Sequence, residues 1–174
     1  METRVITIDG AGLGPRLEAL AEILVGSVAG GAAIGFMAPL AETEARRFWA
    51  EDVRAEIEAG RRVLFGAERA GRLLGTVQLV TAMPPNQPHR CEIAKMMVHP
   101  AARRQGIGRQ LMTAALGHAR GLGRTLVTLD TRSGDAAAPL YASVGFEVAG
   151  EIPDFAWDPD GRARHATTYM YRRL

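Results

Sequence analysis

The chain has 174 residues, 47% apolar and 23% charged, which favours one domain over residues 1–174 and excludes wholesale disorder. One cysteine excludes a disulfide framework and a cysteine-based zinc site. The start lacks a basic segment followed by a long apolar run, so we expect a cytoplasmic protein. Net charge is +2, but residues 93–129 carry six basic and no acidic side chains, whereas residues 130–160 carry seven acidic and one basic. This pattern indicates either two oppositely charged ligands or two solvated faces.

The N-terminal third predicts a strand, a helix and an apolar loop. Residues 4–8 alternate as a strand does, and the leucine spacing predicts a helix over 13–28. No charge occurs between Glu22 and Glu42, but several glycines and Pro39 argue against a membrane-spanning helix. We expect residues 30–37 to form a loop that either closes the core or walls a pocket.

The next segment predicts a helix that Thr43 caps and Gly60 ends, with Glu44 at the positive end of its dipole. Every fourth residue is apolar, which predicts a core-facing stripe of Ala45, Trp49, Val53 and Ile57.

The remaining chain alternates strands and helices. We expect a hairpin of strands 62–68 and 73–82 around Ala70-Gly71, and later strands at 90–98, 125–131, 146–150 and 167–172. Helices are expected at 106–120 and 135–143, with an acidic loop before the last strand and a turn at 159–161. A crossover helix requires a parallel pair, so the predicted class is α/β (α+β), with a mixed sheet flanked by helices.

The strongest chemical motif follows the strand at 90–98. Arg103, Arg104 and Gln105 lead into Gly106-Ile107-Gly108, where a helix is expected to begin. Unpaired N–H groups and the helix dipole bind anions there, and glycine lacks the Cβ that would keep a phosphate away. The segment therefore predicts a phosphate or pyrophosphate cradle. It lacks the lysine of a P-loop and the third glycine of the dinucleotide fingerprint.

The spacing Arg103-x-x-Gly106-x-Gly108 resembles the (Gln/Arg)-x-x-Gly-x-(Gly/Ala) motif of the GNAT superfamily of acetyl-CoA-dependent N-acetyltransferases. Residues 140–146, Leu-Tyr-Ala-Ser-Val-Gly-Phe, are similar to that family's Leu-Tyr-x-x-x-Gly-Phe. The resemblance implies a mostly antiparallel sheet whose strands splay around acetyl-CoA, with no metal. The residues expected to bind the cofactor are Met96, Met97, Val98, Arg103, Arg104, Gln105, Gly106, Ile107, Gly108 and Arg109.

Two details bear on the substrate and on the pantetheine arm. Segments 31–37, 95–98, 108–112 and 159–161, with His165, resemble the tabtoxin-resistance acetyltransferases. This implies acetylation of a primary amine on a small amino-acid-like or dipeptide-like molecule, with toxin resistance as the narrower hypothesis. Many GNAT members carry an asparagine where this chain has Gly134, and either Ser133 or Asp135 could replace it.

Acetyl transfer requires a base for the amine and an acid for the departing thiolate. Strand alternation places Glu92 on one face with Ala94, Met96 and Val98, and we expect burial to tune it as a general base acting through water. Asp130 is the alternative base or an ammonium-binding carboxylate. Tyr141, with a pKa near 10, is the expected acid. The expected substrate contacts are Phe36, Met37, Asp130, Trp157 and His165.

Other functions are less favoured. Cys91 is expected to be a packed thiol, and the four histidines lack metal-ligand spacing. An acyl-CoA-binding regulator without turnover would keep the cradle, but it would not need both Glu92 and Tyr141. Nucleic-acid binding is not favoured, because the sequence shows no helix-turn-helix, stacking aromatics or zinc ligands. The identity of the amine, and whether the chain forms a homodimer, stay open.

Overall fold

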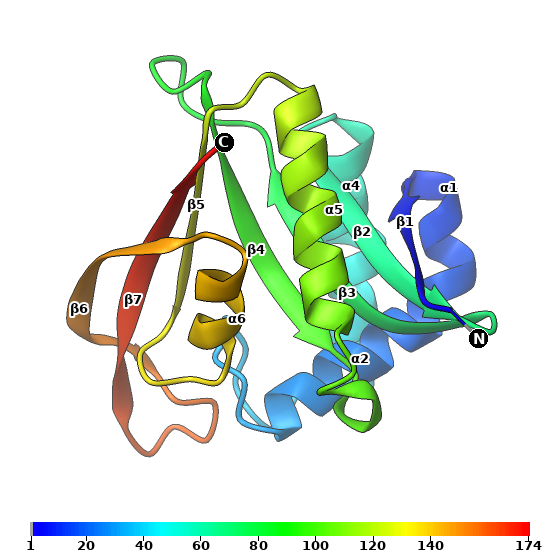
Figure 1. Ribbon diagram of the computed structural model, residues 1–174. Coiled ribbons are helices and arrows are strands. Elements are labelled where there is room, and N and C mark those ends of the chain that lie inside the picture. Colours follow the sequence, from blue (N-terminus) through cyan, green and yellow to red (C-terminus); the bar gives the residue numbers. More distant parts are fainter. Residues whose placement is uncertain (1) are drawn as a thin grey trace.

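A computed structural model describes residues 2–174, whose seven strands form one sheet in the order β1-β2-β3-β4-β5-β7-β6. The strands are β1 (Arg4–Ile8), β2 (Arg62–Arg69), β3 (Arg72–Val80), β4 (Arg90–Val98), β5 (Leu126–Arg132), β6 (Glu147–Trp157) and β7 (Arg164–Arg173). Only β4 and β5 pair in parallel (Figure 1). The predicted mixed and mostly antiparallel sheet is confirmed.

Helices cover both faces of the sheet and enclose two apolar cores (Figure 1). One face carries α5 (Ile107–Gly121) and α6 (Ala137–Ser143), and the other carries α2 (Leu17–Ala29), α3 (Glu42–Arg47) and α4 (Arg54–Glu58), with the short α1 (Gly10–Leu13) beside them. Leu111 and Val127 lie in the first core, whereas Leu24 and Trp49 lie in the second. Within the described residues, no helix is both long and apolar enough to cross a bilayer.

Three local predictions are corrected. The helix expected over 13–28 is divided by a 3-10 turn at Gly14–Arg16 before α2 begins. Ala41, not Thr43, is the N-cap of α3, so Thr43 lies in its first turn. A π-helical segment, Phe48–Val53, follows α3. An apolar repeat of four residues drifts against the α-helical period of 3.6, and the wider π turn absorbs that drift.

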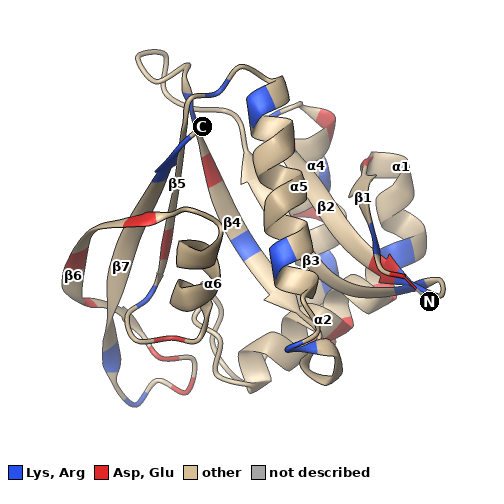
Figure 2. Cartoon of the chain, in the orientation of Figure 1, with Lys and Arg blue, Asp and Glu red and all other residues tan. Residues whose placement is uncertain are grey.

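The C-terminal hairpin is longer than predicted. The expected acidic loop is largely part of β6, which runs to Trp157 and is exposed along nearly its whole length. Figure 2 shows acidic segments along this edge strand. Because solvent reaches both of its faces, β6 needs no apolar alternation, and the sequence pattern therefore hid it. The turn at 159–161 lies between β6 and β7 as expected.

The separation of β4 from β5 positions the site. Their ladder begins at Arg90 and Leu126 and ends where Glu92 pairs with Thr128. Beyond this point β4 continues to Val98 and β5 to Arg132, and the two strands diverge (Figure 1). The resulting gap lies beside the start of α5 and beside α6.

Candidate active site

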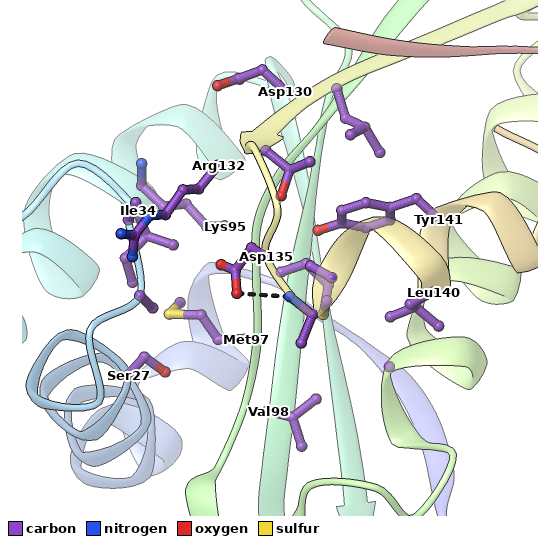
Figure 3. A pocket seen from close by; sticks show the side chains of 18 of the residues that line it. Ser27, Ile34, Lys95, Met97, Val98, Asp130, Arg132, Asp135, Leu140 and Tyr141 are labelled. Carbon is purple, nitrogen blue, oxygen red and sulfur yellow. Dashed lines mark hydrogen bonds between the residues drawn. The ribbon is translucent and has the colours of Figure 1, made fainter. Parts of the chain in front are cut away.

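The gap between β4 and β5 opens into a cavity of about 1170 Å³ (Figure 3). Its walls come from β4, β5, the first turn of α5, α6, the loop at 30–37 and the β6–β7 hairpin. The loop thus walls a pocket, although Ile34 and Phe36 also pack on the second core. Every residue predicted for the site lines this cavity except Gln105.

The first turn of α5 forms one end of the cavity. Gln110 N–H donates to Gly106 O at 3.1 Å, so the amides of residues 107–109 precede the first intrahelical bond. Gly106 has φ +78°, a conformation that favours glycine, and a Cβ there would meet no atom within 4 Å. Space beside Gly106 is thus open, and residues 106–109 line the cavity, which suits a phosphate bound by these amides.

Gly108 has a different role from the one expected. A Cβ on Gly108 would lie 2.8 Å from Leu140 Cδ2, so this glycine lets α6 pack closely against α5. It does not clear a space for phosphate, because a side chain already occupies that space. Ile107 is buried in the first core, which leaves only its backbone to face a ligand.

Basic side chains surround this turn. Arg103 Nε donates to Val98 O at 3.3 Å, and Arg109 Nη1 donates to Ser143 O at 3.3 Å. Neither they nor Arg104 takes part in the ion pairs found among residues 2–174. Gln105 instead accepts from Arg69 Nη1 at 2.7 Å and points away, which corrects its expected place in the cradle.

A β-bulge reverses the side-chain alternation of β4. Gln78 of β3 pairs with Ala94, but two residues back along β3 Thr76 pairs with Met97, so β4 carries one extra residue. Lys95 has φ +50° within this bulge. Met97 therefore faces the second core, while Met96 and Val98 pack on the first, as Ile93 does. The expectation that Glu92 shares a face with Met96 and Val98 is wrong.

Glu92 is less buried than predicted. Its side chain is 39% exposed, because the divergence of β5 leaves this part of the sheet open. Arg90 Nη1 donates to Glu92 Oε2 at 3.2 Å and to Thr128 Oγ1 at 2.7 Å. The carboxylate lines the cavity, but it already has a cationic partner.

Tyr141 projects from α6, and Figure 3 shows its hydroxyl end pointing into the cavity. The side chain is only 6% exposed, and its ring packs edge-to-face on Phe146 with centroids 6.2 Å apart. Burial, followed by the negative charges of Asp135 and Asp130, raises the pKa of Tyr141 above its ordinary value. The expected pKa near 10 is therefore wrong, and the hydroxyl stays a proton donor throughout the neutral range.

The opposite end of the cavity is lined by charged and aromatic side chains. Asp130 Oδ2 accepts from Thr167 Oγ1 at 3.1 Å. Asp158 Oδ1 lies 3.0 Å from both His165 Nδ1 and Arg132 Nη2, so one carboxylate holds two groups. Phe36, Met37 and Trp157 also line this end, which we call the acceptor end. Ala38 N–H donates to Pro159 O at 2.7 Å and joins the two loops there.

Among the charged and aromatic side chains that line the cavity, sequence reasoning assigned no role to Lys95, Arg132 and Phe155. Lys95 is the only lysine of the chain, which was the one available signal. Its Nζ lies 5.9 Å from the centroid of the Phe36 ring, and burial together with the Arg62 charge lowers its pKa. Of the two candidates to replace the family asparagine, Asp135 lines the cavity, whereas Ser133 Oγ lies 2.8 Å from Thr168 Oγ1.

Comparison with known proteins assigns this arrangement to a family. The profile of the Acetyltransferase (GNAT) family matches residues 31–146, about two thirds of the chain, from the cavity loop to the end of the Tyr141 motif. The chain belongs to the GNAT family. It is thus an N-acetyltransferase, and the matched span includes the cradle at the start of α5.

Individual GNAT relatives are moderately similar in sequence. The N-alpha-acetyltransferase RimI of Mycobacterium tuberculosis is 33% identical over 117 residues, covering 63% of this chain and 72% of that protein. An uncharacterized N-acetyltransferase from the hisH-hisA intergenic region of Azospirillum brasilense is 29% identical over 138 residues, covering 75% and 78%.

Solved structures share the fold at lower identity. An N-acetyltransferase from Staphylococcus aureus Mu50 superposes with a TM-score of 0.82 at 18% identity, covering 99% of both chains. The yncA acetyltransferase of Salmonella typhimurium, solved with its cofactor acetyl-CoA, superposes with a TM-score of 0.79 at 22% identity, covering 99% of this chain and 94% of that one.

The cavity of this GNAT chain fits acetyl-CoA on its own geometry. Residues 106–109, which carry the free amides, line the cavity beside the open space at Gly106, and three arginines without carboxylate partners lie around them. Cys91 takes no part, since its side chain is fully buried, which raises its pKa to about 11. The prediction of a packed thiol is confirmed.

Proposed function

We propose that this GNAT enzyme transfers the acetyl group of acetyl-CoA to a primary amine on a small amino-acid-like or dipeptide-like molecule. The observation that carries the proposal is a single cavity with two chemically different ends. An anion cradle and the edge of β4 form one end, charged and aromatic side chains form the other, and Tyr141 lies between them. Such a cavity suits two ligands that meet in the middle.

The cradle end would hold the cofactor. The amides of residues 107–109 and the side chains of Arg103, Arg104 and Arg109 bind the diphosphate and the ribose phosphate. The edge of β4 from Met96 to Val98 has lost β5 as a neighbour, so it can pair with the pantetheine amides as with an added strand. The thioester then lies beside Tyr141, with the Val98 N–H polarising its carbonyl.

The reaction needs one proton removed and one supplied. Asp130 is the better placed base, because its hydrogen-bond partner is the neutral Thr167, whereas Glu92 is paired with Arg90 and acts through water as the alternative. The amine nitrogen bonds to the acetyl carbon, and the bond from that carbon to sulfur breaks. The Tyr141 hydroxyl donates its proton to the departing thiolate, whose ordinary pKa is about 8.5.

The narrower hypothesis of toxin resistance remains a proposal from the sequence resemblance. The acceptor end supports only the size and polarity of such a substrate. Lining groups of both charges, including Asp130, Arg132 and His165, together with the aromatic rings of Phe36 and Trp157, suit a small polar molecule with an apolar part.

Replacing Tyr141 tests the proposal. Tyr141→Phe keeps the ring packing but removes the acid, so we expect kcat to fall by about 10²-fold or more with unchanged KM for acetyl-CoA. Thiol release from acetyl-CoA with a panel of amines measures the rate, and mass spectrometry identifies the acetylated product. Tyr171→Phe is the matched control, since the Tyr171 hydroxyl bonds Glu147 on the exposed hairpin. Binding of acetyl-CoA without thiol release for any amine would instead support a non-catalytic acyl-CoA sensor.

A further inference from the structure

We propose that Lys95 binds a carboxylate of the acceptor, so that the substrate carries both a primary amine and a free carboxylate, as an amino acid does. This inference rests on the proposed function and narrows its substrate class. It separates small amino acids from amines without an acid group and from the N-terminus of a folded protein, whose own carboxyl group is far from its amine.

Lys95 lies next to the loop that walls the acceptor end of the cavity. It follows Ala94 at the bulge and precedes the edge segment from Met96 to Val98 that is proposed to pair with pantetheine. Its Nζ lies beside the Phe36 ring and 3.4 Å from where a Cβ of Gly35 would stand. Both neighbours belong to the loop that walls the acceptor end, so the ammonium group faces the acceptor and not the diphosphate.

The charge of Lys95 lacks an anionic partner. The side chain is half-buried, yet among residues 2–174 no carboxylate oxygen lies within 4.0 Å of its Nζ. Taking a cation out of water costs free energy unless an anion compensates it, and a ring at 5.9 Å compensates only partly. A bound carboxylate would supply the missing partner.

Apart from Lys95, the charged side chains at the acceptor end have a charged partner within the chain, and Asp130 is the exception. Arg132 and His165 share Asp158, and Arg90 holds Glu92. Asp130 accepts only from the neutral Thr167. At the acceptor end, Lys95 and Asp130 therefore remain as one unpaired charge of each sign, and Figure 3 shows both side chains. Asp135, which lies just before α6 and accepts from the Ala136 N–H, and the three cradle arginines are the other charges of the cavity that take part in no ion pair among residues 2–174.

A ligand with opposite charges matches this pair. Its carboxylate would bind the Lys95 ammonium, and its amine would lie toward Asp130, the proposed base. Electrostatic complementarity of this kind also disfavours amines without an acid group, because they leave Lys95 uncompensated.

The experiment compares acids with their amides. Each proteinogenic L-amino acid and its carboxamide is assayed for thiol release with the wild-type enzyme, Lys95→Gln, Lys95→Arg and the remote control Arg120→Gln. We expect the wild type to prefer the acid of the best pair. Lys95→Gln should raise the KM for that acid about tenfold or more, whereas the KM for its amide and for acetyl-CoA stay within about twofold. Lys95→Arg should retain most of the preference, and Arg120→Gln all of it.

Two results would overturn the inference while leaving the proposed function intact. One is that the wild type acetylates amides as readily as acids, and the other is that Lys95→Gln raises both KM values equally. Thermal unfolding of each variant checks its fold, and Lys95→Arg with the acid–amide comparison decides the question if Lys95→Gln does not fold. If no amino acid or amide here, and no amine of the panel that tests the proposed function, releases thiol although acetyl-CoA binds, the proposed function itself fails, and this inference fails with it.

Discussion

Two glycines that the sequence motif treats alike are predicted to respond differently to the same substitution. Gly106 has φ +78°, and a Cβ there would meet no atom within 4 Å, so Gly106→Ala introduces backbone strain without a clash. A left-handed alanine costs about 1–2 kcal/mol, offset by about 0.4–1 kcal/mol because the unfolded chain loses entropy. We expect a net loss of about 1 kcal/mol, or roughly 2–4 °C in Tm for a chain of this size.

Gly108→Ala should change a different property. In a helix interior alanine is more favourable than glycine by about 1 kcal/mol. The Cβ of an alanine at position 108, however, would lie 2.8 Å from Leu140 Cδ2. The leucine must move, and it precedes Tyr141 on α6. Stability should therefore change by less than about 1 kcal/mol, whereas kcat falls, since misplacing a catalytic group by about 1 Å can cost up to about 100-fold.

Calorimetry with coenzyme A separates the two cases. Gly106→Ala places a methyl group in the space that faces the free amides, so we expect Kd to rise about tenfold, equivalent to about 1.4 kcal/mol. Gly108→Ala keeps its amide and should bind like the wild type. The reasoning is refuted if Gly108→Ala weakens coenzyme A as much as Gly106→Ala does, or if neither variant changes the affinity.

Three further results are expected. Because the pKa of Tyr141 is raised, its hydroxyl stays protonated beyond the ordinary value of 10.0, so the pH profile of kcat should show no tyrosine-dependent loss below about pH 10; a loss there that Tyr141→Phe abolishes would contradict this. The free energy of unfolding of Lys95→Ala should be about 1 kcal/mol lower than that of Lys95→Gly, because only alanine keeps a Cβ at φ +50°; equal melting curves would argue against that strain. The exposed apolar residues of edge strand β6 predict a homodimer by light scattering, which Ile152→Glu should dissociate; a monomeric wild type would refute it.

Features encoded in a few neighbouring residues were predictable. The hairpin turn at Ala70-Gly71 was recognised from its glycine, and both residues have positive φ as such a turn needs. The start of α5 was placed within one residue, because Gly106 marks a helix end without reference to the rest of the fold. The same locality explains why nearly all of the predicted site residues line one cavity: the motifs lie at the ends of strands and helices that the topology brings together.

Features that depend on strand register were not predictable. Asp158 holds Arg132 and His165 only because β7 pairs with β5 on one side and β6 on the other, and no local pattern specifies those registers. The acidic stretch suggested a cationic ligand, yet its carboxylate at Asp158 is neutralised within the chain. Segment charge therefore overstated the charge that the cavity presents.

The bulge on β4 links the cofactor edge to the acceptor end. One extra residue reverses which side chains face each core, so alternation counted from Glu92 fails after Ala94. A bulge also increases local twist, which turns β4 away from β5 soon after their ladder ends at Glu92. The same distortion thus frees the strand edge from Met96 to Val98 and places Lys95 at a left-handed position that glycine would occupy with less strain. A lysine at that position sacrifices stability, and the proposed role of its charge in binding the acceptor gives a reason for that cost.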